Sequence, residues 1–343
     1  MSKIKPSKGS PYARILGVGG YRPTRVVPNE VILETIDSSD EWIRSRSGIA
    51  TRHWASDEET VAAMSIEASG KAIADAGITA DKIGAVIVST VSHFKQTPAV
   101  ATEIADKLGT EKAAAFDISA GCAGFGYGLT LAKGLVTEGS ATYVLVIGVE
   151  RLSDLTDLTD RATAFLFGDG AGAVVVGPSD EPEIGPTVWG SEGDKSETIK
   201  QTVPWTDFRL GDVSKLPLDS DGNIKFPAIT QEGQAVFRWA VFEMAKVAKE
   251  ALDAAGLSPD DLDVFIPHQA NMRIIDSMVK TLKLPEHVTV ARDVETTGNT
   301  SAASIPLAME RLLATGEAKS GDTALVIGFG AGLVYAATVV TLP

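Results

Sequence analysis

Short apolar runs alternate with segments of helical periodicity along almost the whole chain. The apolar runs are rich in Val and Ile and mostly apolar on both faces, which is typical of strands buried between helix layers. The pattern therefore predicts an α/β fold. We predict strands at residues 85–91, 113–118, 143–149, 173–177, 264–266, 288–291, 324–327 and 333–340.

Similar segments occur in the same order in the two halves of the chain. Residues 76–83 and the strand after them match residues 255–262 and the strand after those, and two further pairs of segments follow in order. Such order with nearly constant spacing indicates a duplicated α/β unit. We predict an N-terminal half of residues 1–180 and a C-terminal half of residues 181–343, divided in a segment rich in Pro and acidic residues.

The duplication makes the turns after equivalent strands of special interest. Asp117 and Asp293 each follow an apolar run at equivalent places, and Cys122 and Asn299 come a few residues later. Because a twofold arrangement of the halves would bring these turns together, we expect Cys122 and Asn299 to be neighbours.

The composition excludes several classes of protein. A formal net charge of −14 argues against a general nucleic-acid-binding role, and 44% hydrophobic residues allow a large core. One cysteine permits no intrachain disulfide, and no CxxC or HExxH motif indicates a metal site. We expect a cytoplasmic protein without a membrane span or signal peptide. Residues 17–20, Gly-Val-Gly-Gly, superficially resemble a nucleotide-binding loop, but without a following helix they predict a tight turn at a strand end.

The lone thiol, Cys122, lies where a predicted strand ends and a predicted helix begins. The positive end of the helix dipole favours thiolate, so this position is expected to lower the thiol pKa and create a nucleophile. The alternative is that Cys122 is a small buried hydrophobic residue. Glycines crowd the segment and indicate close packing or a narrow substrate tunnel; they are Gly121, Gly124, Gly126 and Gly128.

Two polar residues of the second half are candidate partners for the thiol. His268 directly follows a buried strand, where open α/β sheets place their chemistry. Asn299 lies in a Gly-Asn-Thr-Ser segment. Taken alone, His268 could equally be a hydrogen-bonded core residue, and Asn299 would most simply be a turn or cap residue.

Several segments resemble the β-ketoacyl-acyl-carrier-protein (ACP) synthase III family, and the resemblance covers nearly the whole chain. It is closest to the actinobacterial, Streptomyces-like members. The resemblance implies a thiolase fold with five αβαβα layers from two duplicated halves, a homodimer, and no cofactor. Three segments are similar to the family's active-site motifs, and two more match elsewhere: residues 117–125, 266–271 and 298–306, then 37–43 and 166–173.

The resemblance also implies a reaction. An acyl-CoA acylates Cys122; malonyl-ACP then loses CO2 and attacks the acyl group, giving β-ketoacyl-ACP. His268 and Asn299 would donate hydrogen bonds to the malonyl thioester oxygen. The backbone N–H groups of Cys122 and Ala331 would form the oxyanion hole for the acyl carbonyl, although many family members have Gly at the position of Ala331.

Four residues match the family's CoA-binding positions. Trp42 would stack on adenine, and Arg46 and Arg161 would hold adenine and phosphate groups. Asn271 would bind the pantetheine amides. Without the resemblance, these residues would be interpreted as a core aromatic, two solvated charges and a helix cap.

Further residues are implied in protein contacts. Gln269, Arg273 and Lys280 would contact ACP, since two basic residues on one helix face suit an acidic partner even on an acidic protein. An ordinary solvated helix face is the alternative. Thr97 matches a position that enters the acyl pocket of the partner subunit.

Two other functions remain open from the residues. Cys, His and Asn also serve cysteine hydrolases, which would release free acid from acyl-CoA. A non-catalytic binding protein of the same fold would not gain acyl mass on Cys122. The starter acyl group is not fixed by the sequence.

Overall fold

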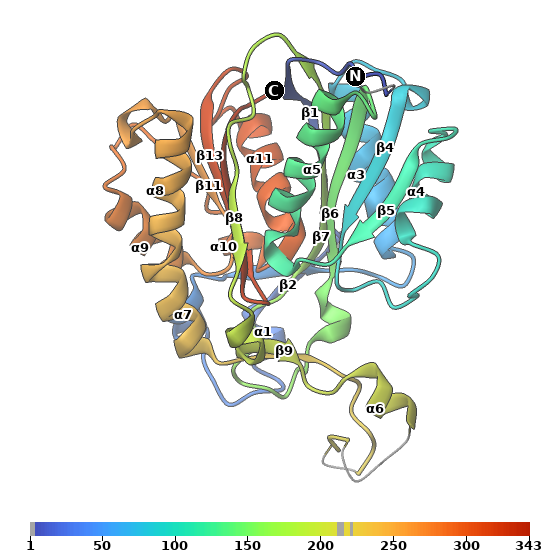
Figure 1. Cartoon of the computed structure of the whole chain (residues 1–343). Helices are drawn as coiled ribbons and strands as arrows, with labels where there is room; N and C mark the ends of the chain where they lie inside the picture. Colours follow the sequence, from blue (N-terminus) through green and yellow to red (C-terminus); the bar gives the residue numbers. More distant parts are fainter. Residues whose placement is uncertain (1–3, 211–215, 220–221) are drawn as a thin grey trace.

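Two five-stranded sheets form the frame of this computed structural model, which describes residues 4–210, 216–219 and 222–343 (Figure 1). The first sheet has the order β1-β7-β6-β4-β5, and the second has the order β8-β14-β13-β11-β12. The first sheet contains β1 (Tyr12–Tyr21), β4 (Ile83–Ser89), β5 (Ala114–Ile118), β6 (Tyr143–Arg151) and β7 (Asp169–Ser179). The second sheet contains β8 (Val188–Ser191), β11 (Val264–Pro267), β12 (Thr289–Val290), β13 (Thr323–Gly330) and β14 (Val334–Thr341).

The two sheets have the same topology. Numbered along the chain within each sheet, the strands lie in the order 1-5-4-2-3 in both. In each sheet the second strand is parallel to the third and fourth, and the fourth and fifth are antiparallel. This identity supports the predicted duplication, and we propose that the halves meet at residues 180–181, between β7 and β8.

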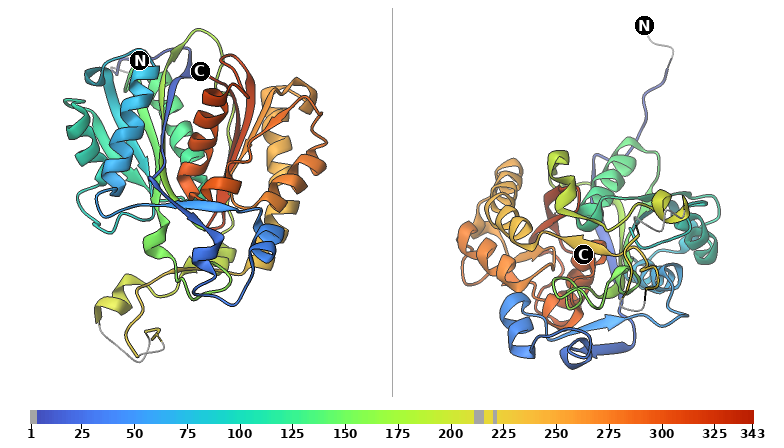
Figure 2. Two further views of the ribbon diagram at one scale, coloured as in Figure 1. Left: turned by 180° about the vertical axis from the view of Figure 1, so that it is seen from behind. Right: turned by 90° about the horizontal axis from the view of Figure 1, so that it is seen from below.

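Helices form three layers around the two sheets (Figures 1 and 2). Helices α3 and α4 cover the outer face of the first sheet, α5 and α11 lie between the sheets, and α7, α8 and α9 cover the second sheet. The result is the five-layered αβαβα arrangement. The bounds are α3 (Val61–Asp75), α4 (Val100–Leu108), α5 (Gly124–Glu138), α7 (Gly233–Phe242), α8 (Met244–Ala255), α9 (Met272–Leu282) and α11 (Ser304–Thr315).

The central layer is packed tightly on both sides. Phe125 and Leu129 of α5 are fully buried in the core that the two sheets share. A Cβ on Gly126 would lie 2.9 Å from the Ala336 Cβ of the second sheet, and one on Gly128 would lie 2.8 Å from Val146 Cγ1 of the first. The glycines of α5 therefore let one helix touch both sheets, which confirms the close packing predicted for this segment.

The predicted turn at residues 17–20 is wrong. These residues lie inside β1 and pair with β7. A Cβ on Gly17 would be 2.3 Å from the backbone nitrogen of Ala76, and one on Gly19 would be 2.2 Å from the carbonyl oxygen of Ala68. These glycines therefore allow α3 to lie against the strand, which is a requirement that sequence periodicity does not show.

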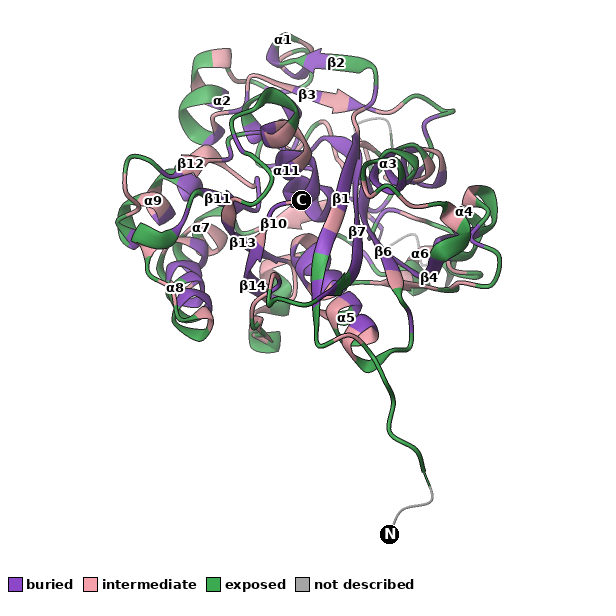
Figure 3. Cartoon of the chain, turned by 90° about the horizontal axis from the view of Figure 1, so that it is seen from above, coloured by how far each residue is buried: buried purple, intermediate pink, exposed green. Residues whose placement is uncertain are grey.

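Smaller elements close the ends of the layers. Figure 3 shows buried strands and α11 at the centre of the molecule and an exposed N-terminal segment.

Among the described residues, no helix is long and apolar enough to span a membrane. The remaining elements are the pairs β2 (Arg25–Pro28) with β3 (Thr51–Trp54) and β9 (Ile199–Gln201) with β10 (Ile229–Gln231), and the helices α1 (Asn29–Ile32), α2 (Asp40–Ser47), α6 (Trp205–Leu210) and α10 (Val294–Thr297).

Candidate active site

Cys122 lies on a short 3₁₀ turn, η2 (Gly121–Ala123), between the end of β5 and the start of α5. The end of β13 crosses directly beside it. A Cβ on Gly330 would lie 2.9 Å from the sulfur, and one on Gly121 would lie 3.4 Å from the backbone nitrogen of Ala331. The backbone of the second half thus reaches the thiol because Gly330 carries no side chain.

His268 follows β11 and is held from the start of α11. Its Nδ1 lies 2.7 Å from Ser304 Oγ, and the backbone N–H of Gln269 donates to the same oxygen at 3.3 Å. We infer that the Ser304 hydroxyl donates to Nδ1, which places the ring proton on Nε2. The ring packs edge-on against Phe329, with 5.4 Å between the centroids.

Asn299 has an equally defined orientation. Its Oδ1 accepts a hydrogen bond of 2.8 Å from the backbone N–H of Ser301. The carboxamide oxygen is therefore used inside the protein, and the NH2 group of Asn299 is the end left for a ligand. An isolated parallel β-bridge pairs the backbones of Phe167 and Asn299 and so joins the two halves of the chain at this point.

One cavity of about 290 Å³ brings these groups together. Cys122, His268 and Asn299 all line it, and the turn that carries Cys122 contacts η7 (Ser301–Ala303), which follows Asn299. The expectation that Cys122 and Asn299 are neighbours is confirmed. Most of the remaining wall is apolar, including Leu155, Phe167, Val236, Trp239 and Phe329.

A second cavity of about 480 Å³ continues from the first toward the surface. The two share Gln231, Val236, Ala270, Ile274 and Asn299 as lining residues. The outer cavity is lined by three of the predicted CoA-binding residues: Trp42, Arg46 and Asn271.

The entrance pairs an aromatic ring with two cations. The guanidinium groups of Arg161 and Arg46 lie 4.8 and 5.7 Å from the centre of the Trp42 ring. Asn271 caps α9 by accepting from the Arg273 N–H, and its NH2 group donates to the Arg46 carbonyl. The predicted roles of Trp42, Arg46 and Arg161 stay predictions, and Asn271 is already engaged by the protein.

Burial controls the protonation of both central groups. It raises the pKa of the Cys122 thiol to about 12 and lowers the pKa of the His268 imidazole to about 3. The predicted lowering of the Cys122 pKa is not supported, because the cost of placing a charge in this apolar site acts against the helix dipole. At neutral pH the site holds a neutral thiol and a neutral imidazole.

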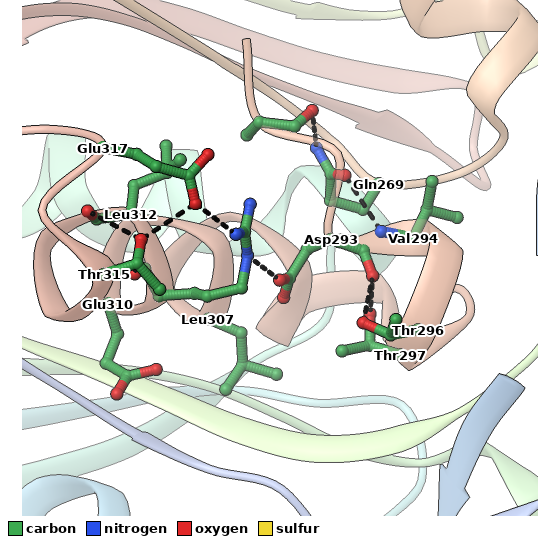
Figure 4. Close-up of polar contacts among 12 residues, drawn as sticks. Gln269, Asp293, Val294, Thr296, Thr297, Leu307, Glu310, Leu312, Thr315 and Glu317 are labelled. Carbon is green, nitrogen blue, oxygen red and sulfur yellow. Dashed lines mark hydrogen bonds and ion pairs between the residues drawn. The ribbon is translucent and has the colours of Figure 1, made fainter. Parts of the chain in front are cut away.

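The predicted contact between the Gln269 side chain and ACP is wrong, because this side chain is buried. Its side chain is fully buried, and it donates to the carbonyls of Pro267 and Ala291 and accepts from the Val294 N–H. Figure 4 shows Gln269 turned toward Val294. This residue fixes the loop after β11 internally, so its side chain is unavailable to a docked protein.

The other predicted contact residues are accessible. Arg273 and Lys280 are exposed on α9, and the Arg273 guanidinium lies 5.0 Å from the centre of the Phe237 ring. Thr97 is exposed on the segment after β4 and does not line the cavity of its own chain. Within the described residues, no group of three or more His, Cys, Asp or Glu side chains could hold a metal ion.

Sequence reasoning missed three residues that organise the site. Ser301 and Ser304 lie in the same segment as Asn299, residues 298–306, so the sequence could have indicated their hydroxyl groups as part of the site. Glu150 comes directly after the predicted strand at residues 143–149, and nothing in that segment indicates a functional carboxyl group. The structure places the Glu150 carboxylate within reach of Ser301 Oγ, at 3.3 Å.

Family comparisons agree with this architecture. Residues 116–193 match the family described as 3-oxoacyl-[acyl-carrier-protein (ACP)] synthase III, and residues 252–342 match its C-terminal family. The chain is 89% identical to β-ketoacyl-[acyl-carrier-protein] synthase III 1 of Streptomyces coelicolor, with all of both chains covered. It is 53% identical to the mycobacterial β-ketoacyl-[acyl-carrier-protein] synthase III of Mycobacterium marinum, covering 100% of this chain and 99% of the relative.

Solved structures show the same fold. The priming β-ketosynthase of the R1128 polyketide biosynthetic pathway superimposes with a TM-score of 0.94 at 45% identity, covering 100% of this chain and 99% of the other. The 3-oxoacyl-[acyl-carrier-protein] synthase III of Aquifex aeolicus gives 0.84 at 36% identity, with 96% and 99% covered. The chain therefore belongs to the β-ketoacyl-[acyl-carrier-protein] synthase III family, which consists of condensing acyltransferases with the thiolase fold.

Proposed function

We propose that this protein joins a short-chain acyl-CoA to malonyl-ACP in two half-reactions at Cys122, initiating fatty acid synthesis. The observation that carries the proposal is the single cavity lined by Cys122, His268 and Asn299 and continuous with an entrance at Trp42 and Arg46. The walls are apolar and the inner volume is about 290 Å³, which suits a short straight or branched acyl chain.

In the first half-reaction, Cys122 attacks the acyl thioester and CoA leaves. Negative charge develops on the acyl carbonyl oxygen, and two backbone N–H groups can stabilise it by donating hydrogen bonds to that oxygen. The Cys122 N–H and the Ala331 N–H are the proposed donors, because both residues line the cavity at the point where β13 passes the thiol. The Ala331 side chain has no part in this role.

In the second half-reaction, malonyl-ACP loses CO2 and its carbanion equivalent attacks the acyl-cysteine. The developing charge on the malonyl thioester oxygen needs neutral donors that are already oriented. The Nε2–H of His268 and the NH2 group of Asn299 are these donors. Both side chains are oriented by hydrogen bonds on the opposite end of the side chain, to Ser304 and to the Ser301 N–H. Removal of one such donor costs about 3–4 kcal/mol of transition-state stabilisation.

CoA and ACP are proposed to approach the same entrance. Adenine would stack on Trp42 between Arg46 and Arg161, whose cations suit the phosphates. Arg273 and Lys280 on α9 would attract the acidic carrier, whereas Gln269 does not contribute a side chain. The reaction is proposed to need no cofactor, because loss of CO2 supplies the carbanion.

We further propose that the protein works in the cytoplasm as a homodimer, with Thr97 entering the partner's acyl pocket. Large exposed aromatic side chains gather near the segment that carries Thr97. The Phe94 ring lies 5.7 Å from the Trp205 ring and 5.4 Å from the Phe226 ring, and each of the three side chains is more than 40% exposed. Such an apolar cluster supports an interface between subunits.

The proposed function is tested by product analysis. The protein is incubated with acetyl-CoA or a short branched acyl-CoA together with malonyl-ACP, and the products are separated by mass. Condensation gives β-ketoacyl-ACP, CoA and CO2 in equal amounts. Release of free acid from acyl-CoA, without elongation of ACP, would instead identify a cysteine hydrolase.

A further inference from the structure

Glu150 is a fully buried carboxyl group behind the active site. It lies on β6 and receives hydrogen bonds from Ser92 Oγ at 2.6 Å, from the Val91 N–H at 3.1 Å and from Thr90 Oγ1 at 3.3 Å. These donors stabilise a charge in the protein interior. The half-reactions above leave this carboxyl group without a role.

Ser301 connects this carboxyl group to the thiol. Its hydroxyl donates to Glu150 Oε1 at 3.3 Å. Ser301 also lines the same cavity as Cys122, and its hydroxyl acts against burial by lowering the pKa of that thiol. Ser301 has a φ of +47°, which is unfavourable for a residue with a side chain. The fold keeps Ser301 in this unfavourable left-handed conformation, and the conformation places its hydroxyl between a thiol and a carboxylate. We infer that this position has a functional requirement.

The thiol proton needs an acceptor other than His268. The Ser304 hydroxyl leaves the imidazole with its proton on Nε2, the atom proposed to face the substrate oxygen. An Nε2–H group donates a hydrogen bond and cannot accept a proton.

We propose that Glu150 is the terminal acceptor of the Cys122 thiol proton and that Ser301 transfers it. As the S–H bond breaks, its proton moves to Ser301 Oγ and the Ser301 proton moves to Glu150. The sulfur lone pair then forms the bond to the acyl carbon. When the C–S bond to CoA breaks, the CoA sulfur keeps the electron pair and takes the proton back through Ser301, so that no proton is consumed. This step rests on the proposed acylation of Cys122.

The charges around Glu150 allow this cycle near neutral pH. Burial raises the pKa of Glu150 to about 7, and Cys122 is the titratable group that faces it through Ser301. Arg151, the next residue, pairs with Asp57 and Asp154 instead. Asp169, opposite Arg151 on β7, accepts from the Ala55 and Ser153 amides and from the Ser153 hydroxyl.

Single-turnover acylation as a function of pH tests the relay. The full-length protein is mixed with acetyl-CoA, quenched, and followed by intact mass between pH 5.5 and 9.5. In the unmodified protein, the rate should rise with an inflection near pH 7, as Glu150 ionises. Ser301→Gly keeps the left-handed backbone but removes the hydroxyl, so its rate at pH 7.5 should fall about 100-fold and its inflection should move upward.

Two further variants separate a proton relay from a structural role. Glu150→Gln should behave like Ser301→Gly. Ser92→Ala removes a donor to the carboxylate, so its inflection should move up by about one pH unit while the maximal rate is kept; this variant also tests the relay if Glu150→Gln does not fold. Asp169→Asn is the matched control for loss of a buried carboxyl group and should leave the inflection in place.

The outcomes are distinct. If the unmodified protein is acylated but Ser301→Gly and Ser92→Ala keep its inflection, the relay is wrong, even if Ser301→Gly is slower. If the unmodified protein gains no acyl mass from any acyl-CoA, the proposed function itself fails.

Discussion

Ser304 and His268 are joined by a hydrogen bond of 2.7 Å between the serine Oγ and the imidazole Nδ1. The bond connects the first residue of α11 to the loop after β11, and it leaves the Nε2–H directed at the cavity. Because burial lowers the pKa of His268 to about 3, the ring is a neutral donor throughout the physiological range. Ser304 thus sets both the position and the tautomer of the imidazole.

Ser304→Ala should impair decarboxylation more than acylation. Loss of the hydroxyl frees the imidazole to rotate and to exchange tautomers, so decarboxylation of malonyl-ACP should slow about 10-fold to 100-fold. Acylation of Cys122 should change by less than about threefold, since Cys122 is not oriented by this bond. Release of CO2 from labelled malonyl-ACP measures the first effect. Equal losses in both half-reactions would contradict the positioning role.

Asn299→Asp should abolish decarboxylation although the shape of the side chain is kept. One carboxylate oxygen can still accept from the Ser301 N–H, as Oδ1 of Asn299 does at 2.8 Å. The other oxygen replaces the donor NH2 group and would face the developing negative charge. We expect a loss of about 100-fold or more in CO2 release. A variant with near-normal CO2 release would show that the Asn299 amide is not a donor to the substrate.

Gly330→Ala should block acylation without unfolding the protein. The added methyl group would lie 2.9 Å from the Cys122 sulfur, which must move or lose its approach to the acyl carbon. Acylation should fall about 100-fold, because displacement of a reacting atom by about 1 Å has effects of that size. Gly134→Ala on α5 is the matched control, since nothing lies within 4 Å of the added Cβ. Equal acylation of both variants would contradict the close contact.

Much of the architecture is encoded in local patterns, and all eight predicted strands are present. Strands buried on both faces, such as β6 and β13, form continuous apolar runs that few other elements produce. The strand β1 was partly mistaken for a turn, since its glycines serve contacts with α3 that are remote in sequence. Helix packing of this kind leaves no periodic signal.

The site could be predicted where a functional side chain lies at the end of a strand or a helix that the sequence pattern itself indicates. Cys122, His268 and Asn299 stand at strand or helix ends, and the duplication itself indicated that two of them meet. The surroundings of Glu150 and the raised pKa of Cys122 depend on neighbours from both halves. Such effects arise only once the halves are packed together.

Glu150 should make the stability of the protein depend on pH. Its pKa rises from an ordinary 4.5 to about 7 in the folded protein, so the folded state binds more protons between these values. The stability that protonated Glu150 contributes is complete below about pH 4.5 and is lost as the pH rises through about 7. Glu150→Gln lacks this loss, so its stability relative to the unmodified protein should improve by up to about 3 kcal/mol between pH 5 and 8.

Thermal or denaturant unfolding at the two pH values measures this difference. Glu250→Gln, at an exposed position of α8, is the matched control and should show no comparable change. If the stability difference between Glu150→Gln and the unmodified protein is the same at pH 5 and pH 8, the carboxyl group does not titrate in this range.

Intact-mass analysis across the two half-reactions tests the role of Cys122 most directly. After incubation with a panel of short acyl-CoAs, the unmodified protein should gain the mass of one acyl group, located on the peptide that contains Cys122. Addition of malonyl-ACP should remove that mass and produce β-ketoacyl-ACP, whereas Cys122→Ser should gain none. Equal acyl mass on the Cys122→Ser protein, or an acyl group that malonyl-ACP fails to remove, would contradict the account.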